Sequence, residues 1–350
     1  MAEDAGSVYS EVRIHLDQLD NDLKGVYARL DQMESRIKSQ TSTASKTATK
    51  SFDAMSVAGV AAFLGVGNAI KSTISTYASF SQSMSNVAAA SNATGAQLQE
   101  LTDAAKNAGA TTKYTASQAA DALFNLAQAG MSADQATQAL SGVLSLAQAS
   151  GAGLAESAES VSATLSQFGL QASDASRVAN VFAASANTSL SSMDKLTAGL
   201  RQVGPVAGTL GISLEEVTAN LDALFNKGFQ GEQAGTALRS ILLDLVDPSS
   251  TVVQALEKQG VAYDKVNPKV VGLSGAFENM QKAGVDLTTV FGKVSAAEAL
   301  ALIDTAGKAT GNLRDMQKEI SGTNAAEKAS KIMNDNLQGS LKTMQSQAES

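Results

Sequence analysis

The amino-acid sequence predicts a mainly α-helical protein built as an array of short packed helices. Only three of its 350 residues are proline, so long stretches carry no residue that must break a helix. Hydrophobic residues make up 44% of the chain but aromatic residues only 4%, so the apolar content rests largely on alanine, a strong helix former that lets helices approach closely. Apolar residues also recur at helical spacing along most of the chain.

Residues 1–40 are predicted to form a short strand followed by a heptad helix. Residues 7–16 alternate in polarity, which is typical of a strand. From residue 16 the apolar residues follow at spacings of three and four, as in the seam of a coiled coil. This seam consists of Leu16, Leu19, Leu23, Val26, Leu30, Met33 and Ile37. We expect a homo-oligomer through it; another helix of the same chain or a different protein are the alternative partners.

Residues 41–91 are predicted to hold a linker and an uncharged helical segment. The Ser/Thr-rich run over residues 39–51 has no apolar periodicity, which is typical of a linker. Residues 54–70 carry no charge and are at the short limit for a membrane span, which needs about 20 apolar residues. We interpret them as a buried or self-associating helix, with a membrane-spanning helix as the alternative.

From residue 92 to 260 the sequence predicts short helices with clear ends. Helix starts are indicated by capping boxes, in which the first side chain caps a free backbone N–H and the fourth reaches back. These boxes are Thr115–Gln118, Ser132–Gln135, Ser213–Glu216 and Ser295–Glu298, the last beyond this region. Helix ends with a left-handed glycine are predicted at Gly130, Gly169, Gly228 and Gly260. No fixed period of the kind that a solenoid requires is found.

Residues 261–350 are predicted to contain one small β-hairpin and the C-terminal helices. Val261, Tyr263 and Val266 precede the turn signal Asn267-Pro268, and two valines follow it, which favours a hairpin over residues 261–272. A last helix is expected over residues 325–345. Its apolar stripe is Ile332, Met333, Leu337, Leu341 and Met344.

The sequence predicts no catalytic, cofactor-binding or metal-binding residues. The chain has no cysteine, and its one histidine, His15, cannot build a zinc site of the usual kinds alone. No Ser-His-Asp arrangement, G-x-S-x-G motif or P-loop is found. A glycine pair at Gly65 and Gly67 imitates a dinucleotide fingerprint, but Ile70 stands where the third glycine belongs.

The charge balance argues against nucleic-acid binding and against export. A net charge of −8 repels phosphate backbones, and the few basic residues are dispersed without interleaved aromatic residues. The acidic N-terminal segment lacks the basic and apolar regions of a signal peptide. We therefore expect no specific nucleic-acid partner and assembly in a reducing cytoplasm, with which the lack of cysteine is compatible.

Five elements between residues 92 and 260 resemble, in the same order, the conserved core of phage tail tape measure proteins. They are Ala108–Ser117, Leu126-Ala-Gln-Ala-Gly130, Leu146-Ala-Gln-Ala-Ser150, Val203-Gly-Pro-Val-Ala207 followed by Gly211-Ile-Ser-Leu-Glu-Glu216, and Gly231-Glu-Gln-Ala-Gly-Thr-Ala-Leu-Arg239. All five fit architectural roles. Gly204-Pro205 is expected to end a helix, and Ala234-Gly235 to let another helix approach.

The resemblance implies a structural virion component of the tail lumen, assembled in the host bacterial cytoplasm. It implies a role in tail assembly, tail-length determination and genome ejection, with the tail tube protein, tail assembly chaperones and the host membrane as partners. A long helical stretch usually follows this core in the family, so the chain is expected to be a fragment, a truncated prophage product or a short member. The alternative function, suggested by residues 54–99, is a helical membrane-active translocator or pore-former.

Overall fold

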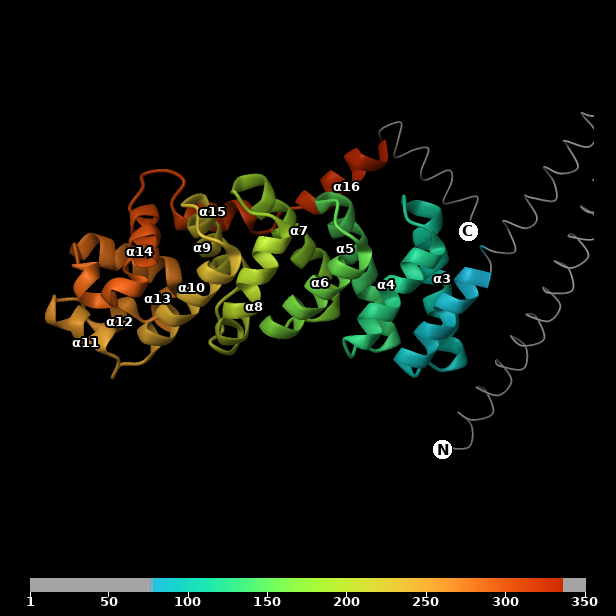
Figure 1. Cartoon of the computed structure of the whole chain (residues 1–350), viewed down its shortest axis with the longest axis horizontal. Helices are drawn as coiled ribbons and strands as arrows, with labels where there is room; N and C mark the ends of the chain where they lie inside the picture. The colour runs from blue at the N-terminus through green and yellow to red at the C-terminus, as the bar shows by residue number, and fades with distance from the viewer. Residues whose placement is uncertain (1–75, 77, 336–350) are drawn as a thin grey trace, which may run out of the picture.

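The computed structural model describes residues 76 and 78–335 (Figure 1). Within that range every regular element is a helix and no strand occurs, which confirms the predicted mainly α fold. The heptad helix predicted over residues 16–37 and the uncharged segment 54–70 lie outside the described residues.

Most of the helices are short and joined by tight connections. They are a helix over residues 78–91, α3 (Gly95–Thr111), α4 (Ala116–Gln128), α5 (Ala133–Ser150), α6 (Leu154–Phe168), the 3-10 turn η1 (Ala172–Asp174), α7 (Ala175–Thr188), α8 (Met193–Thr209), α9 (Leu214–Asn226), α10 (Gly231–Val246), α11 (Thr251–Lys258), α12 (Tyr263–Val266), α13 (Pro268–Ala283), α14 (Leu287–Ala306), α15 (Leu313–Ile320) and α16 (Ala325–Asp335).

Helices α3 to α10 stack in two layers. In one layer α3, α5, α7 and α9 pack each on the next, and in the other α4, α6, α8 and α10 do the same. Consecutive helices join the two layers, and a continuous apolar core lies between them. The result is an elongated array with α3 near one end and α11 to α13 at the other (Figure 1).

The two-layer stack has a period that the sequence analysis missed. Helices α4, α6, α8 and α10 begin at residues 116, 154, 193 and 231, so each starts 38 or 39 residues after the one before. Helices α3, α5, α7 and α9 begin at residues 95, 133, 175 and 214, with the longer step where η1 is inserted. The prediction that the helices have no fixed period of the kind that a solenoid requires was therefore wrong. A unit of two helices recurs, as in α-solenoids.

One kind of corner recurs between the helices. It consists of a left-handed glycine, an apolar residue and the residue that starts the next helix, and it occurs six times in the described range. The corners are Gly130-Met131-Ser132, Gly169-Leu170-Gln171, Gly211-Ile212-Ser213, Gly228-Phe229-Gln230, Gly260-Val261-Ala262 and Gly284-Val285-Asp286. In each corner the apolar residue donates its backbone N–H to the carbonyl five residues earlier, at 2.8–3.5 Å, and its side chain packs on the core. This is the Schellman ending of a helix, with its hydrophobic contact.

The predicted helix ends are largely confirmed. All four predicted glycines have positive φ, between 63° and 92°. Thr115 and Ser132 form reciprocal capping boxes with Gln118 and Gln135. Ser213 caps α9, but the Glu216 carboxylate does not reach back, because it accepts the backbone N–H of Ser274 at 3.1 Å instead.

The remaining box, Ser295–Glu298, lies inside α14 rather than at its first residue. The backbone of α14 is kinked at Gly292, which has a φ of 65°, and helical structure resumes shortly before the predicted box. Whether the Ser295 side chain caps this second part stays a prediction, since that side chain is outside what the structure describes.

The predicted β-hairpin over residues 261–272 is wrong. These residues form α12 and the start of α13, because Asn267 accepts the N–H of Lys269 and caps the helix. Pro268 takes the first helical position, where its missing N–H would have no partner in any case. Asn-Pro is thus a helix start here, and Val266, Val270 and Val271 on either side of it lie in helices, whereas Val261 lies in the preceding corner.

The expectation that Gly204-Pro205 ends a helix is also wrong, since α8 runs on to Thr209. Proline removes only the hydrogen bond to the carbonyl of Arg201, whose side of the helix is exposed to solvent. Packing against α6 explains why α8 continues past Pro205. A β-carbon on Gly204 would overlap the Gln167 side chain, and one on Gly208 would overlap the Gln167 carbonyl oxygen, so both sides of the proline lie tightly on the end of α6.

Glycine-mediated backbone contact also sets the α8–α10 crossing, as predicted for Gly235. A β-carbon on Gly235 would overlap the carbonyl oxygen of Gly199, and one on Gly231 would overlap that of Lys195. Two helices whose facing positions are glycine can approach until their backbones touch. This is why a chain poor in aromatic residues still packs a continuous core.

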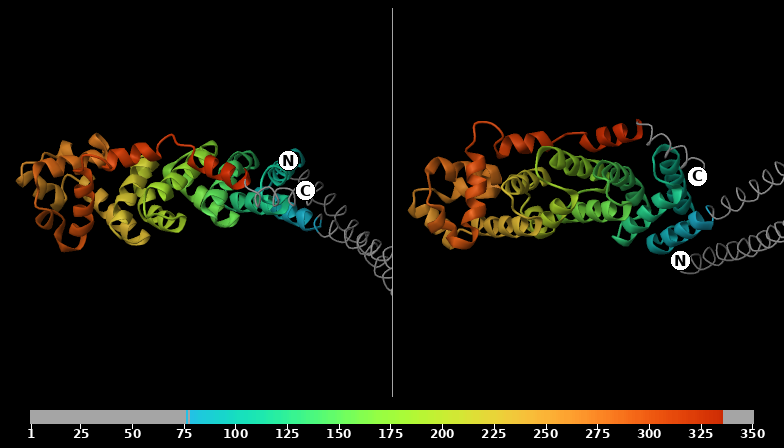
Figure 2. Two further views of the ribbon diagram at one scale, coloured as in Figure 1. Left: turned by 90° about the horizontal axis from the view of Figure 1, so that it is seen from above. Right: turned by 45° about the horizontal axis from the view of Figure 1, so that its top comes forward.

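The last two helices form a strap along the array, defined here as α15 and α16 (Figure 2). After α14 the chain turns back toward the α3 end; α15 packs on α9 and α7, and α16 packs on α7 and α5. The predicted helix over residues 325–345 is confirmed as far as Asp335, where the described residues end.

We predict that Gly235→Ala destabilises the array, because the added β-carbon forces α10 away from α8. The expected loss is about 1–3 kcal/mol, the usual cost of overpacking. Gly95→Ala is the matched control, since Gly95 lies in the first turn of α3 with open space around its β position. It should be neutral or slightly stabilising. Urea unfolding followed by circular dichroism measures both, and equal stabilities would contradict the backbone contact.

Candidate functional site

The five family-like elements lie at corners and helix contacts, and they do not converge on one cleft. Leu126–Gly130 and Leu146–Ser150 close α4 and α5, and Gly211–Glu216 forms the corner into α9. Val203–Ala207 lies within α8, and Gly231–Arg239 opens α10 where it crosses α8. Their common role is to set the geometry of the array.

No candidate metal centre is assembled in the described part of the chain. Among residues 78–335 no three histidine, cysteine, aspartate or glutamate side chains come together in a way that could hold a metal ion. His15 lies outside the described residues. The expectation of no catalytic, cofactor or metal residues therefore stays a prediction.

The alternative function, a membrane-active translocator or pore-former, requires a segment that inserts into a membrane. Among the residues that the structure describes, no helix combines the length and the apolarity needed to cross a bilayer. Of residues 54–99, which prompted the idea, residues 54–75 and 77 fall outside that range.

Helix α9 is almost fully buried and carries polar side chains into the interior of the array. Nearly every residue of α9 is buried, including Asp222, which is 1% exposed. One oxygen of Asp222, Oδ1, accepts the hydroxyl of Ser185 at 2.6 Å and lies 2.9 Å from that of Ser189. The other oxygen, Oδ2, has no hydrogen-bond partner among the described residues. Burial raises the pKa of Asp222 to about 7, although the two serine hydroxyls act to lower it.

Two further polar contacts join helices across the repeats. Arg177 on α7 donates two hydrogen bonds to the buried carboxylate of Glu215 on α9, at 2.7 and 2.8 Å. This pairing raises the pKa of Arg177, chiefly through the hydrogen bond to Glu215. Asn180 on α7 holds the strap: it accepts the N–H of Ala326 at 2.9 Å and donates to Glu327 at 3.2 Å.

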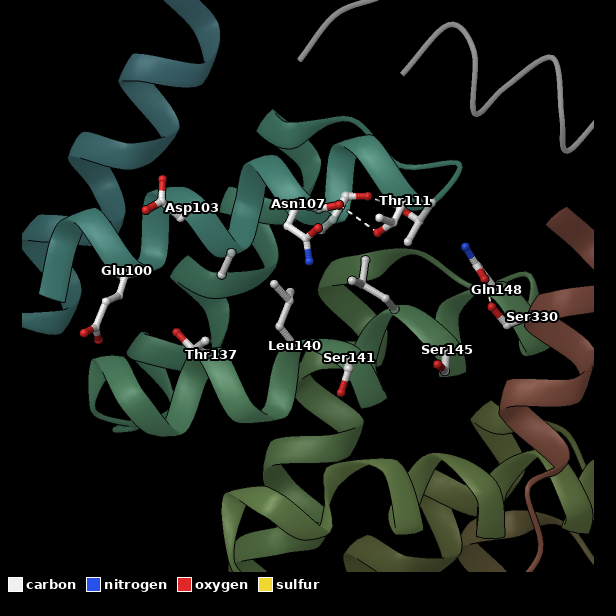
Figure 3. Close-up of a pocket in the computed structure, with 14 residues that line it drawn as sticks. Glu100, Asp103, Asn107, Thr111, Thr137, Leu140, Ser141, Ser145, Gln148 and Ser330 are labelled. Atoms are coloured by element: carbon white, nitrogen blue, oxygen red, sulfur yellow. Dashed lines mark hydrogen bonds between the residues drawn. The ribbon is translucent and has the colours of Figure 1, made fainter. Parts of the chain in front are cut away.

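A groove of about 600 Å³ lies between α3 and α5 (Figure 3). Its apolar lining consists of Ala104, Ala108, Leu140 and Leu144, and its rims carry hydroxyl, amide and carboxylate groups. Figure 3 shows Glu100 near one end and the hydrogen-bonded pair Gln148 and Ser330 at the other. Ser330 belongs to the strap, so the groove begins where α16 reaches α5.

The buried polar positions of α7 and α9 and the polar residues of the groove were not predicted from the sequence. Asp222 lies within an apolar run, next to Leu221 and shortly before Leu224 and Phe225, and this is the one local sign that its carboxylate is buried. Asn180 and Ser330 become partners of distant residues only through the tertiary fold. No local pattern could have indicated the groove.

We predict that stability falls as the pH rises from about 4 to 7, because the pKa of Asp222 is higher in the folded chain than its ordinary value of 3.8. Folding favours the protonated carboxyl of Asp222. Its contribution to the free energy of unfolding is therefore fully present below the pKa of the unfolded chain. That contribution is lost by about 1.4 kcal/mol per pH unit as the pH rises toward the pKa of the folded chain.

Asp222→Asn keeps the acceptor oxygen for both serines but cannot ionise. It should remove this part of the pH dependence and be at least as stable as the natural chain at pH 8. Urea unfolding at pH 5 and pH 8 tests this; Asp121→Asn, an exposed control on α4, should leave the slope unchanged. The same slope in Asp222→Asn as in the natural chain would refute the assignment.

Comparison with known proteins places these features in a family. The family model described as "Phage-related minor tail protein" matches residues 102–301. The chain is 31% identical over 274 residues to the "Tape measure protein" of Pneumococcus phage Dp-1, covering 76% of this chain and 24% of that protein. It is 26% identical over 266 residues to the "Probable tape measure protein" of Escherichia phage P2, covering 73% of this chain and 32% of that protein.

The chain therefore spans about a quarter to a third of the length of these curated relatives. No solved structure matches it significantly. The matched region, residues 102–301, runs from within α3 into α14 and contains the two-layer stack almost in full. Because this region is more than half of the 350 residues, the chain belongs to the family of phage-related minor tail proteins and is a relative of phage tape measure proteins.

Proposed function

We propose that this chain is a tape measure component: a structural, non-catalytic protein of the phage tail that acts in tail assembly, tail-length determination and genome ejection. The observation that carries this proposal is the alignment of 76% and 73% of the chain with two tape measure proteins. The match extends across the stack and is not confined to one short motif.

The architecture suits a mechanical role. Two layers of helices around one continuous core give an elongated body whose length is set by the number of repeats. With a net charge of −8 it would not adhere to DNA that passes it, because like charges repel.

Within this proposal the chain interacts with other tail components, namely the tail tube protein and tail assembly chaperones. It would occupy the tail lumen of the virion after assembly in the host cytoplasm, and contact with the host membrane would follow on ejection. Residues 92–260 would be the tape measure core. Residues 1–40 would form a short strand and a heptad helix, residues 41–91 a linker and an uncharged helical segment, and residues 261–350 the C-terminal helices. A homo-oligomer through the seam from Leu16 to Ile37 is part of this proposal.

The length-setting role predicts a proportional change in tail length. Two further tandem copies of residues 325–345, inserted after residue 345 in the phage that encodes the chain, should lengthen the tail by up to about 60 Å if they are helical, at 1.5 Å per residue. Electron microscopy of purified tails measures this.

The matched control inserts the same number of glycine and serine residues, which do not form a rigid spacer. Tails of unchanged length with the helical insert would contradict the ruler role, and a strain without tails would restrict the chain to assembly. Co-purification with the tube protein is the separate test of the partner proposal.

A further inference from the structure

The strap covers the layer of α3, α5, α7 and α9 one junction at a time. Helix α15 packs on α9 and α7, and α16 packs on α7 and α5. Helix α15 does so with Leu313, Met316 and Ile320, all buried, which form one apolar face at helical spacing. The outer face of this layer therefore accepts a short amphipathic segment at each of two consecutive junctions.

The next junction in the same direction, between α5 and α3, is the groove of about 600 Å³. Of the strap residues in the described range, only Ser330 lines it, at the end where Gln148 lies (Figure 3). The size lies within the usual range for a binding pocket, and its apolar lining is framed by polar groups. The hydroxyl of Thr137 in its wall is buried and has no hydrogen-bond partner among the described residues.

The chain continues directly from the strap at this point. Ser330 is five residues before Asp335, and residues 336–345 follow with the sequence Asn-Leu-Gln-Gly-Ser-Leu-Lys-Thr-Met-Gln. Leu337, Leu341 and Met344 are spaced by four and three, as on α15. The segment contains one basic residue, Lys342, and no acidic one, whereas the groove is lined by Glu100 and Asp103 and by no basic residue.

We propose that the α3–α5 groove is the binding site for residues 336–345 of the same chain, so that the strap covers a third junction of the layer. The apolar residues of the segment contact the parts of Leu140 and Leu144 that stay accessible, 4% and 7% of these residues, and Lys342 lies toward the acidic rim. Because the segment is tethered at Ser330, its effective concentration is on the order of millimolar, so that even weak contacts suffice.

The absence of cysteine makes the proposal directly testable. Ser141→Cys places a single thiol on α5 in the exposed lining of the groove. Maleimide should label it roughly tenfold more slowly in an otherwise natural chain than in one that also carries Leu337→Asp and Leu341→Asp, a factor that corresponds to about 1.4 kcal/mol of binding. Ser166→Cys, exposed on α6 and away from the groove, is the matched control and should react equally in both backgrounds.

A second experiment identifies the occupant. The double variant Ser141→Cys, Leu341→Cys should form a disulfide within one chain on mild oxidation, because bound partners come within bonding distance. A disulfide that links two chains would show that a second copy fills the groove and would overturn the proposal. Equal labelling rates without any cross-link would overturn it as well. Circular dichroism confirms that each variant is folded, and neither outcome bears on the proposed role in the tail.

Discussion

The constraint on which the array depends is the corner built from a left-handed glycine, an apolar residue and a cap. Such a corner ends one helix and satisfies backbone carbonyls that this end would otherwise leave unpaired, and at Ser132, Ser213 and Asp286 its last residue also caps the next helix. Its apolar residue, Ile212 for example, is anchored in the core, so the corner cannot swing. The same local geometry recurs at α4–α5, α6–α7, α8–α9 and α9–α10, so much of the two-layer stack shares its connections without any need for similar helix sequences.

The second requirement is close approach between neighbouring helices of the same layer. Stacking at a period of 38 or 39 residues brings α10 onto α8 and α7 onto α5, and both contacts rely on glycine at the crossing, Gly235 and Gly142. Backbone contact of this kind leaves little space for aromatic side chains, which accounts for their scarcity. It also buries polar groups of α9. Asp222 and Glu215 are tolerated because neighbouring helices donate hydrogen bonds to their carboxylates, and Asn220 donates its amide N–H to the carbonyl of Glu216 within α9.

The sequence was sufficient for the fold class, for most helix ends and for the family. Capping boxes and left-handed glycines are local devices, so Thr115, Ser132 and Gly130 could be interpreted without tertiary knowledge. Two local signals misled: Asn267-Pro268 is compatible with a turn and with a helix start, and Pro205 is tolerated inside α8 because it lies on the exposed side of the helix while Gly204 and Gly208 pack on α6. The period was missed because the repeats share corners and spacing rather than residues. The groove, Asp222 and Asn180 depend on contacts between distant helices and have no local signature.

The strap changes how the array holds together. In a stack where each unit touches only its neighbours, stability is roughly a sum of local terms, and one end can open while the other stays folded. Asn180 and Ala326 are 146 residues apart in sequence, and their hydrogen bond ties the last helix to the middle of the array. Through α15 and α16 the strap touches α9, α7 and α5, so opening any of these junctions also disturbs its packing. An elongated stack is stabilised by this coupling, because local fraying is replaced by the more costly loss of several contacts together.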